Sequence, residues 1–208
     1  MLDVRWLGSV AYAEALELQT RLRDQRLAGE LPDTVLLLEH PDVITFGRAA
    51  DASNARLSDA ELRARGYDVA RVNRGGDVTW HGPGQLIGYP ILDLAPRGGD
   101  VHAYLRDLEG VLISALADFN VRAQRRKGYT GVWLDERRKI ASIGIGVRRG
   151  VTMHGFALNV DCDLARFDVI VACGLPGVEM TSMLHELGSI DAEAVRTRIT
   201  AALHHVFS

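Results

Sequence analysis

The chain has 208 residues, of which 47% are hydrophobic and 25% are charged, and its formal net charge is −3. This length suits one domain with a single sizeable core, and the composition is that of an ordinary globular protein, not a disordered one. The small net charge provides no global field for nucleic acid, and no stretch approaches the roughly 20 apolar residues of a membrane span. We therefore expect one domain over residues 1–208 that binds neither nucleic acid nor membrane. Basic clusters at 125–127, 137–139 and 148–149 either line a local basic groove or lie in solvated turns.

The cellular compartment follows from the N-terminus and the cysteines. The first residues lack the basic region and apolar run of a signal peptide. Only Cys162 and Cys173 are present, too few for a disulfide framework, which favours a reducing compartment. The sequence therefore predicts a cytoplasmic protein.

The first half of the chain is predicted to alternate helices and strands. Apolar residues with helical spacing, flanking glycine and proline, and short buried runs define these elements. They are a helix over Ser9–Ala28, a strand over Thr34–Glu39, a helix over Ser58–Arg65, a strand over Tyr67–Asn73 and a glycine-rich loop over Arg74–Gln85.

The second half is predicted to contain more strands between two helices. Asp100 is the expected N-cap of a helix whose apolar face runs from Val101 to Phe119. A closing helix places Val195, Ile199, Ala202 and Val206 on one face. The strands are Leu86–Leu92, Gly131–Asp135, Lys139–Val147 and Val151–Asn159, with a hairpin turn at 148–150. Consecutive strands with a hairpin favour a mixed β-sheet with helices on one side, an α+β architecture.

Familiar cofactor and metal motifs are absent. Gly82 and Gly84 are not followed by the third glycine of a dinucleotide fingerprint. The chain has two lysines, Lys127 and Lys139, and neither stands in a phosphate-binding P-loop. Ser142 lacks the first glycine of a nucleophile elbow, and His185 lacks the second histidine of a zinc protease. The two cysteines, eleven positions apart, do not suggest a zinc site. We therefore predict no metal and no cofactor.

The loop Arg74–Gln85 is the strongest local signal. Its glycines let the backbone approach a bound group and aim N–H donors at it, and polar side chains alternate with Trp80 as an apolar wall. The alternative is a tight irregular loop that only reverses the chain.

The two cysteines stand in different settings. Asp161 and Asp163 flank Cys162, and their charges disfavour a thiolate. Cys173 lies in an uncharged turn next to Gly174, accessible to a substrate. If either thiol is a nucleophile it is Cys173, although a free cysteine is more often an inert core residue.

A nucleophilic thiol needs a base or a cation beside it. His81, His154 and Lys139 are the possible partners. In a regular strand, Lys139 shares a face with Ala141, Ile143, Ile145 and Val147, which places its amine at the margin of a desolvated site. The alternative is a lysine at a strand end that reaches into water.

These residues resemble those of a known family. The stretch from Arg74-Gly75-Gly76 to Gly84-Gln85, followed by Gly88-Tyr89-Pro90, resembles the signature of the octanoyltransferases of lipoate biosynthesis. Further blocks agree in order: Gly131-Val132-Trp133, Lys139-Ile140-Ala141-x-Ile143-Gly144, His154-Gly155-Phe156-Ala157-Leu158-Asn159-Val160, and Cys173-Gly174 followed by Thr181-Ser182-Met183. Two positions depart from the expected pattern, Ala172 in place of proline and Ser142 in place of alanine.

The resemblance implies a fold like the catalytic domain of biotin and lipoate-protein ligases. It makes Cys173 the acyl-thioester nucleophile and Lys139 the group that makes this thiol more acidic, with His154 and Asn159 as supporting residues. The implied acyl pocket consists of Arg74, Gly75, Gly76, Asp77, Val78, Thr79, Trp80, His81, Ser142, Ile143, Gly144, Gly155, Phe156 and Ala157.

The resemblance also implies the reaction partners. Octanoyl-acyl carrier protein is the implied donor, and lipoyl domains of 2-oxoacid dehydrogenases and the glycine-cleavage H protein are the implied acceptors. Backbone amides at Gly75, Gly76 and Cys173 are the expected oxyanion donors. The alternatives are an ATP-dependent lipoate or biotin ligase, an amidotransferase acting between lipoyl domains, and a non-catalytic module that binds carrier protein.

Overall fold

The computed structural model describes residues 2–175 and 177–208, without the side chain of Cys173. Its main sheet is mixed, with strand order β1-β2-β6-β10-β9-β8-β7, and β11 pairs with β9. In chain order its strands are β1 Asp3–Ser9, β2 Thr34–Glu39, β6 Gln85–Ile91, β7 Gln124–Arg126, β8 Tyr129–Trp133, β9 Arg138–Arg148, β10 Val151–Asn159 and β11 Glu179–Met180. The helices are α1 Tyr12–Leu27, α2 Asp59–Ala64, α3 Val101–Ala117, α4 Met183–Leu187 and α5 Ala192–Phe207.

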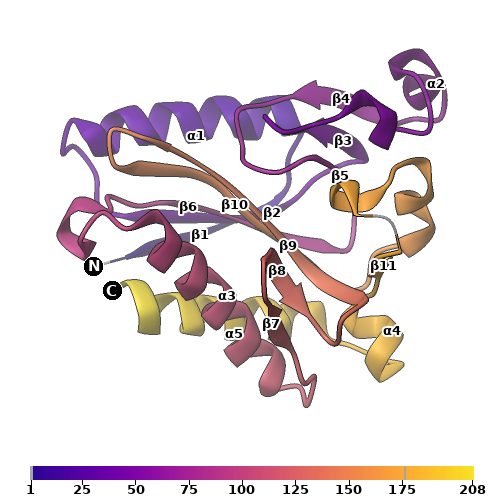
Figure 1. Ribbon diagram of the computed structural model, residues 1–208. Helices are drawn as coiled ribbons and strands as arrows, with labels where there is room; N and C mark the ends of the chain where they lie inside the picture. The colour runs from indigo at the N-terminus through magenta and orange to yellow at the C-terminus, as the bar shows by residue number, and fades with distance from the viewer. Residues whose placement is uncertain (1, 176) are drawn as a thin grey trace.

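Helices cover both faces of this sheet (Figure 1). Successive side chains of a strand point to opposite faces. Along β2, Val35 and Leu37 therefore join the core under α3 and α5, whereas Leu36 and Leu38 join the core under α1. The predicted α+β class with a mixed sheet is confirmed, but the prediction that the helices lie on one side is wrong. Because β2 is buried on both faces, its continuous apolar run indicates two covering layers and not one.

The predicted helices form where their capping and spacing indicate. The carboxylate of Asp100 accepts hydrogen bonds from the N–H groups of His102 and Ala103 and so caps α3. Ser58 and Glu61 form a capping box at the start of α2. In α5 the fully buried positions continue through Leu203 and Phe207, and the predicted Ala202 and Val206 are only partly buried beside them.

A second sheet was not foreseen. It has the order β4-β3-β5, in which β3 is Val43–Phe46, β4 is Asp68–Arg71 and β5 is Val78–His81. The predicted loop over Arg74–Gln85 therefore contains a strand, since β5 pairs antiparallel with β3. The edge strands β1 and β7 were also missed, because edge strands are specified by their pairing partners more than by their own residues.

The second sheet supports the chain around Cys173. Its apolar face packs against the 3₁₀ segment Leu164–Val169, where the rings of Trp80 and Phe167 meet edge to face at 5.0 Å. A further 3₁₀ turn, η4, spans Ala172–Gly174. Tertiary packing thus brings η4 to the side of β5 and the glycine-rich loop.

Candidate active site

A cavity of about 310 Å³ lies where the glycine-rich segment meets strands β9 and β10. This volume is at the lower end of the range for small-molecule sites, roughly 300–1,000 Å³. Thirteen of the implied pocket residues line it: Arg74, Gly75, Gly76, Asp77, Val78, Thr79, His81, Ser142, Ile143, Gly144, Gly155, Phe156 and Ala157. Lys139, His154 and Leu175 line it as well. The structure therefore brings together residues from segments as distant in the chain as Arg74 and Leu175.

Trp80 is the exception among the implied pocket residues. In β5 it alternates with Thr79 and His81, which line the cavity, so its indole points to the opposite face. There it is buried, and its Nε1–H donates to the carboxylate of Asp42 at 2.8 Å. Trp80 therefore supports the second sheet and does not form a wall of this cavity.

Arg74 supplies a fixed positive charge at the cavity. Its side chain is only 7% exposed, and its guanidinium donates to the carbonyl oxygen of Thr45 at 2.7 Å and to the hydroxyl of Thr45 at 2.8 Å. It also donates to the carbonyl oxygen of Gly75 at 3.0 Å. These bonds tie the glycine-rich segment to β3 and hold its curvature around the cavity.

One end of the cavity is a cluster of aromatic and imidazole rings that the sequence interpretation missed. Tyr12 and Tyr89 line the cavity together with His81, and the ring of His40 lies between them. His40 donates from Nδ1 to the carbonyl oxygen of Val10, and its Nε2 accepts from the Tyr89 hydroxyl, both at 2.7 Å. Tyr89 stood in the quoted signature, but Tyr12 and His40 carried no local signal.

Burial keeps the rings at this end of the cavity uncharged. Desolvation lowers the pKa of His40 and of His154 to about 4 each, and it lowers the pKa of His81 well below its ordinary value. Burial also raises the pKa of Tyr12 to about 12 and that of Tyr89 well above its usual range. Neutral rings suit the tail of an apolar acyl group better than ionised ones would.

These histidines predict an acid-sensitive fold. The unfolded chain binds protons near pH 6.5, whereas folded His40 and His154 bind them only near pH 4. Stability is therefore fully present above pH 6.5 and falls as the pH drops toward 4, by about 3 kcal/mol for each histidine. Urea unfolding measured at several pH values across this interval should show the free energy of unfolding falling as the pH falls. The slope reports the number of protons taken up on unfolding, and His40→Phe should reduce that number by one. His205→Phe, at an exposed position, is the control for the effect of a histidine-to-phenylalanine exchange itself.

His154 has a left-handed backbone in the middle of β10, with φ of 58°. Its N–H donates to the side-chain carbonyl of Gln19 in α1 at 2.8 Å, and this bond holds the conformation. Within the described part of the chain, its buried Nδ1 has no hydrogen-bond partner. His154, predicted as a supporting residue, thus lies at the cavity wall.

Asn159 acts on the cavity through a neighbour. Its Oδ1 accepts from Gln85 Nε2 at 2.9 Å, and its own Nδ2 donates to the carbonyl oxygen of Thr181. The amide of Gln85 is fixed by this bond, so its Oε1 faces His81 at 3.2 Å and accepts a hydrogen bond from the Nδ1–H of that ring. The Nε2 of His81 then carries the free lone pair of the neutral ring.

Lys139 is buried at the cavity wall, with only 3% of its surface exposed. Its Nζ lies 5.0 Å from the ring centroid of Trp133, a cation–π contact. The alternative in which this lysine reaches into water is therefore wrong. The stem packs on Gly131, where a Cβ would come within 2.7 Å of Lys139 Cε, so a side chain there would displace the amine. Gly131 is itself held by its N–H, which donates to buried Glu109 at 3.0 Å.

Cys162 is an unfavourable nucleophile as the sequence indicates, but partly for another reason. Cys162 is buried, and this burial is the largest of the effects that raise the pKa of its thiol to about 12, ahead of Asp161 and Asp163. Cys173 lies in η4, and its side chain is outside the described part of the structure. Leu175, two residues later, lines the cavity.

One expected oxyanion donor is already engaged. The N–H of Gly75 donates to the carbonyl oxygen of Ile145 in β9 at 2.7 Å. Because this bond fastens the glycine-rich segment to the sheet, Gly75 cannot offer the same N–H to an oxyanion, and that expectation is wrong. The amides of Gly76 and Cys173 stay predictions.

The described residues, 2–175 and 177–208, offer neither a metal site nor a membrane-spanning helix. They contain no group of histidine, cysteine and acidic side chains that could hold a metal ion. None of their helices has the length and apolar run that a bilayer crossing requires.

The fold and cavity place the chain in a class of catalytic domains. A family model described as the lipoyl protein ligase A/B catalytic domain matches residues 11–204. A bi-partite lipoate protein ligase from Thermoplasma acidophilum has a similar structure, with a TM-score of 0.74 and 14% identity over 99% of this chain and 84% of that one. Biotin protein ligase from Aquifex aeolicus is more distant, with a TM-score of 0.58 and 12% identity over 98% of this chain and 69% of that one. These likenesses confirm the predicted fold.

The sequence comparison gives the particular family. The octanoyltransferase of Geotalea uraniireducens (strain Rf4) is 50% identical over 196 residues, which cover 94% of this chain and 88% of that protein. The chain therefore belongs to the octanoyltransferase family of acyltransferases.

Proposed function

We propose that this enzyme transfers an octanoyl group from octanoyl-acyl carrier protein to the ε-amine of a lysine on apo lipoyl domains, through a thioester on Cys173. Octanoyl transfer follows from family membership. The observation that carries the mechanism is that one cavity is lined by buried Lys139 and by Leu175, which follows the turn that holds Cys173. A buried amine beside a thiol is the arrangement that makes a cysteine nucleophilic.

In the first half-reaction, the Cys173 thiolate attacks the carbonyl carbon of the donor thioester. The tetrahedral oxyanion accepts hydrogen bonds from backbone amides, among which we retain Gly76 and Cys173. Its collapse breaks the bond to the carrier sulfur, and the ammonium of Lys139 donates a proton to that leaving thiolate. The products are octanoyl-Cys173 and carrier protein with a free thiol.

In the second half-reaction, the ε-amine of the acceptor lysine attacks the Cys173 thioester. Lys139, now neutral, accepts the proton that the attacking amine loses, and the Cys173 thiolate leaves. The sum converts a thioester and an amine into an amide and a thiol. Since an amide is more stable than a thioester, the transfer needs no ATP.

The cavity supports an apolar acyl chain as the transferred group. Ile143 and Phe156 provide apolar walls, and the neutral rings of Tyr12, His81 and Tyr89 form the end described above. A chain held between such walls is shielded from water, which favours aminolysis of the thioester over its hydrolysis.

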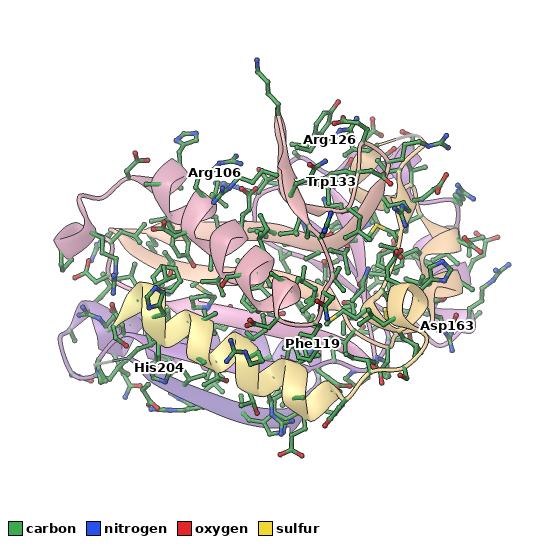
Figure 2. The ribbon with its side chains drawn as sticks, turned by 90° about the horizontal axis from the view of Figure 1, so that it is seen from below. Arg106, Phe119, Arg126, Trp133, Asp163 and His204 are labelled. Carbon is green, nitrogen blue, oxygen red and sulfur yellow. The ribbon has the colours of Figure 1, made fainter. Side chains whose placement is uncertain are left out.

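Basic side chains near the cavity favour an acidic donor. Tyr129 and Thr130 of β8 line the cavity, and the hairpin that leads into them exposes Arg125 and Lys127. Figure 2 shows Arg106 of α3 and Arg126 of this hairpin at the same edge of the molecule. An acidic carrier protein is steered to such a surface by charge complementarity. A reactive free thiol requires a reducing environment, so we place the reaction in the cytoplasm.

The acceptors that we propose are lipoyl domains of 2-oxoacid dehydrogenases and the glycine-cleavage H protein. Membership in the lipoyl protein ligase A/B family supports lipoyl domains as the class of acceptor. The amine that reacts must reach the cavity mouth, which a lysine on an exposed turn of a small domain can do.

The test is ATP-free transfer to a purified apo lipoyl domain. We expect the acceptor mass to rise by one octanoyl group when enzyme and octanoyl-acyl carrier protein are added without nucleotide. A ligase would instead leave the acceptor mass unchanged without ATP, and it would exchange pyrophosphate into ATP in the presence of lipoate. An amidotransferase would accept an octanoylated lipoyl domain as donor and ignore the carrier protein. A binding module would leave the acceptor mass unchanged under every condition.

A further inference from the structure

The turn η4 that carries Cys173 is held by a segment far away in the sequence. The N–H of Val171 donates to the carbonyl oxygen of Asn54 at 2.7 Å, and the N–H of Arg56 donates to the carbonyl oxygen of Val169 at 2.9 Å. Ala55 and Ile170 form an isolated antiparallel bridge between these bonds. The backbone entering η4 is therefore fastened to residues 54–56.

Asp77 belongs to the same contact. One carboxylate oxygen accepts from the N–H of Val78 at 2.7 Å and from the N–H of Asp51 at 3.2 Å. The other accepts from Nδ2 of Asn54. Both oxygens of Asp77 thus face protein donors, and a carboxylate with these bonds is a poor wall for an apolar chain. Its place at the cavity edge needs another explanation.

Gly174 supplies that explanation. It has a left-handed backbone with φ of +64°, and a Cβ there would lie 2.1 Å from Asp77 Oδ2 and 2.8 Å from Asn54 Nδ2. The backbone directly after Cys173 therefore rests against the Asp77–Asn54 pair. Only glycine allows this approach, because any side chain would push the turn away from the pair.

We propose that Asp77 and Asn54 form a latch that holds η4 in place, so that Asp77 positions Cys173 and does not bind the acyl chain. This inference rests on the proposed role of Cys173 as nucleophile. A thiol must be held in line with the donor carbonyl, and a displacement of about 1 Å can cost as much as ~10²-fold in rate. The latch meets this need by contact with Gly174, the residue directly after Cys173.

The test measures the rate constant for acylation of Cys173 by octanoyl-acyl carrier protein, read by rapid quench and intact-protein mass. Asp77→Ala removes the carboxylate, and we expect this rate constant to fall by ~10- to 10²-fold while the donor KM and the preference for acyl-chain length stay unchanged. Asp59→Ala is the matched control. It removes an exposed carboxylate that pairs with Arg71 in the same second sheet, and it should leave the rate constant unchanged.

A charge-conserving exchange separates the latch from general damage to the fold. Asn54→Asp alone sets two carboxylates against each other and should slow acylation at least as much as Asp77→Ala. The double variant Asn54→Asp with Asp77→Asn reverses the direction of the hydrogen bond and should restore most of the rate. Val171 is extended (φ −91°, ψ 99°) and Ala172 begins the turn, so a proline at position 172 fits the backbone. Because proline limits the conformational freedom of the turn, adding Ala172→Pro to Asp77→Ala should restore part of the acylation rate.

The outcomes distinguish this inference from the proposal on which it rests. If Cys173→Ser forms no acyl-enzyme and Asp77→Ala acylates at the wild-type rate, the nucleophile stands and the latch is wrong. A raised donor KM or an altered chain-length preference in Asp77→Ala would make Asp77 an acyl contact and overturn the latch. Failure of both the exchange and the proline to recover any rate would also overturn it. If Cys173→Ser still forms the acyl-enzyme, the proposed function itself fails.

Discussion

Cys173→Ser should abolish the octanoyl adduct and reduce transfer by on the order of 10³-fold or more. A serine hydroxyl ionises far less readily than a thiol, and near neutral pH it is a far weaker nucleophile than a thiolate. The measurement is intact-protein mass after mixing with octanoyl-acyl carrier protein. Wild-type enzyme should gain one octanoyl group, and Cys173→Ser should gain none.

Cys162→Ser is the matched control for that experiment. Cys162 is buried and its thiol pKa is raised to about 12, so it cannot supply a thiolate at neutral pH. The Cys162→Ser variant should therefore gain the same adduct as the wild type. An adduct that survives in Cys173→Ser would assign the nucleophile elsewhere. Acceptor amide formed with no adduct on the wild type would indicate direct transfer from donor to acceptor.

Lys139→Arg should lower octanoyl transfer by about 10²-fold while preserving alkylation of Cys173 by iodoacetamide. Arginine keeps the positive charge that stabilises a thiolate, but it cannot release a proton near neutral pH. Lys139→Met, which matches the stem that packs on Gly131 but lacks the charge, should lose both transfer and rapid alkylation. Steady-state transfer and alkylation rates measured on both variants therefore separate proton shuttling from thiolate stabilisation.

The two Lys139 variants also show how the interpretation would fail. Transfer at the wild-type rate by Lys139→Arg would rule out the proton shuttle and leave only an electrostatic role. Unchanged alkylation in Lys139→Met would show that another group activates Cys173. His81, whose Nε2 keeps its lone pair, would then be the next residue to test. Gly131→Ala is expected to resemble Lys139→Met, because a Cβ at 131 would lie 2.7 Å from both Lys139 Cε and the carbonyl oxygen of Ala141 and so would move the amine away from its position.

Local sequence patterns predicted much of the fold. The cap at Asp100, the helix after Ser58, the hairpin between β9 and β10, and the buried strand β2 form where the residues indicate, since each depends on neighbours in the chain. The family signature located most of the cavity in the same way, through glycines and polar residues at fixed spacing. The second sheet escaped because β3 and β5 are short and gain their stability from pairing with each other.

Residues that meet only through tertiary structure could not be found from local pattern. Tyr12 reaches the cavity because α1 packs against β6 and β10, and the ring of His40, which follows β2, contacts Tyr12 behind the cavity wall. Packing also decided whether a residue of the signature faces the cavity or supports the fold. Trp80 points away from the cavity, and the N–H of Gly75 is bonded to the carbonyl oxygen of Ile145. No spacing rule could assign these orientations, since each depends on which face of a strand meets which neighbour.

The sequence by itself determined the α+β class, the family and the reacting pair that we propose, Cys173 and Lys139. It did so because reactive groups, glycine turns and helix caps are encoded by residue type at short range. Only the tertiary structure decided that Lys139 is buried on Trp133 and Gly131, and that Asp77 rests against the turn of Cys173. The physical reason is that burial and contact depend on segments distant in the chain, whose approach is set by packing of the whole core.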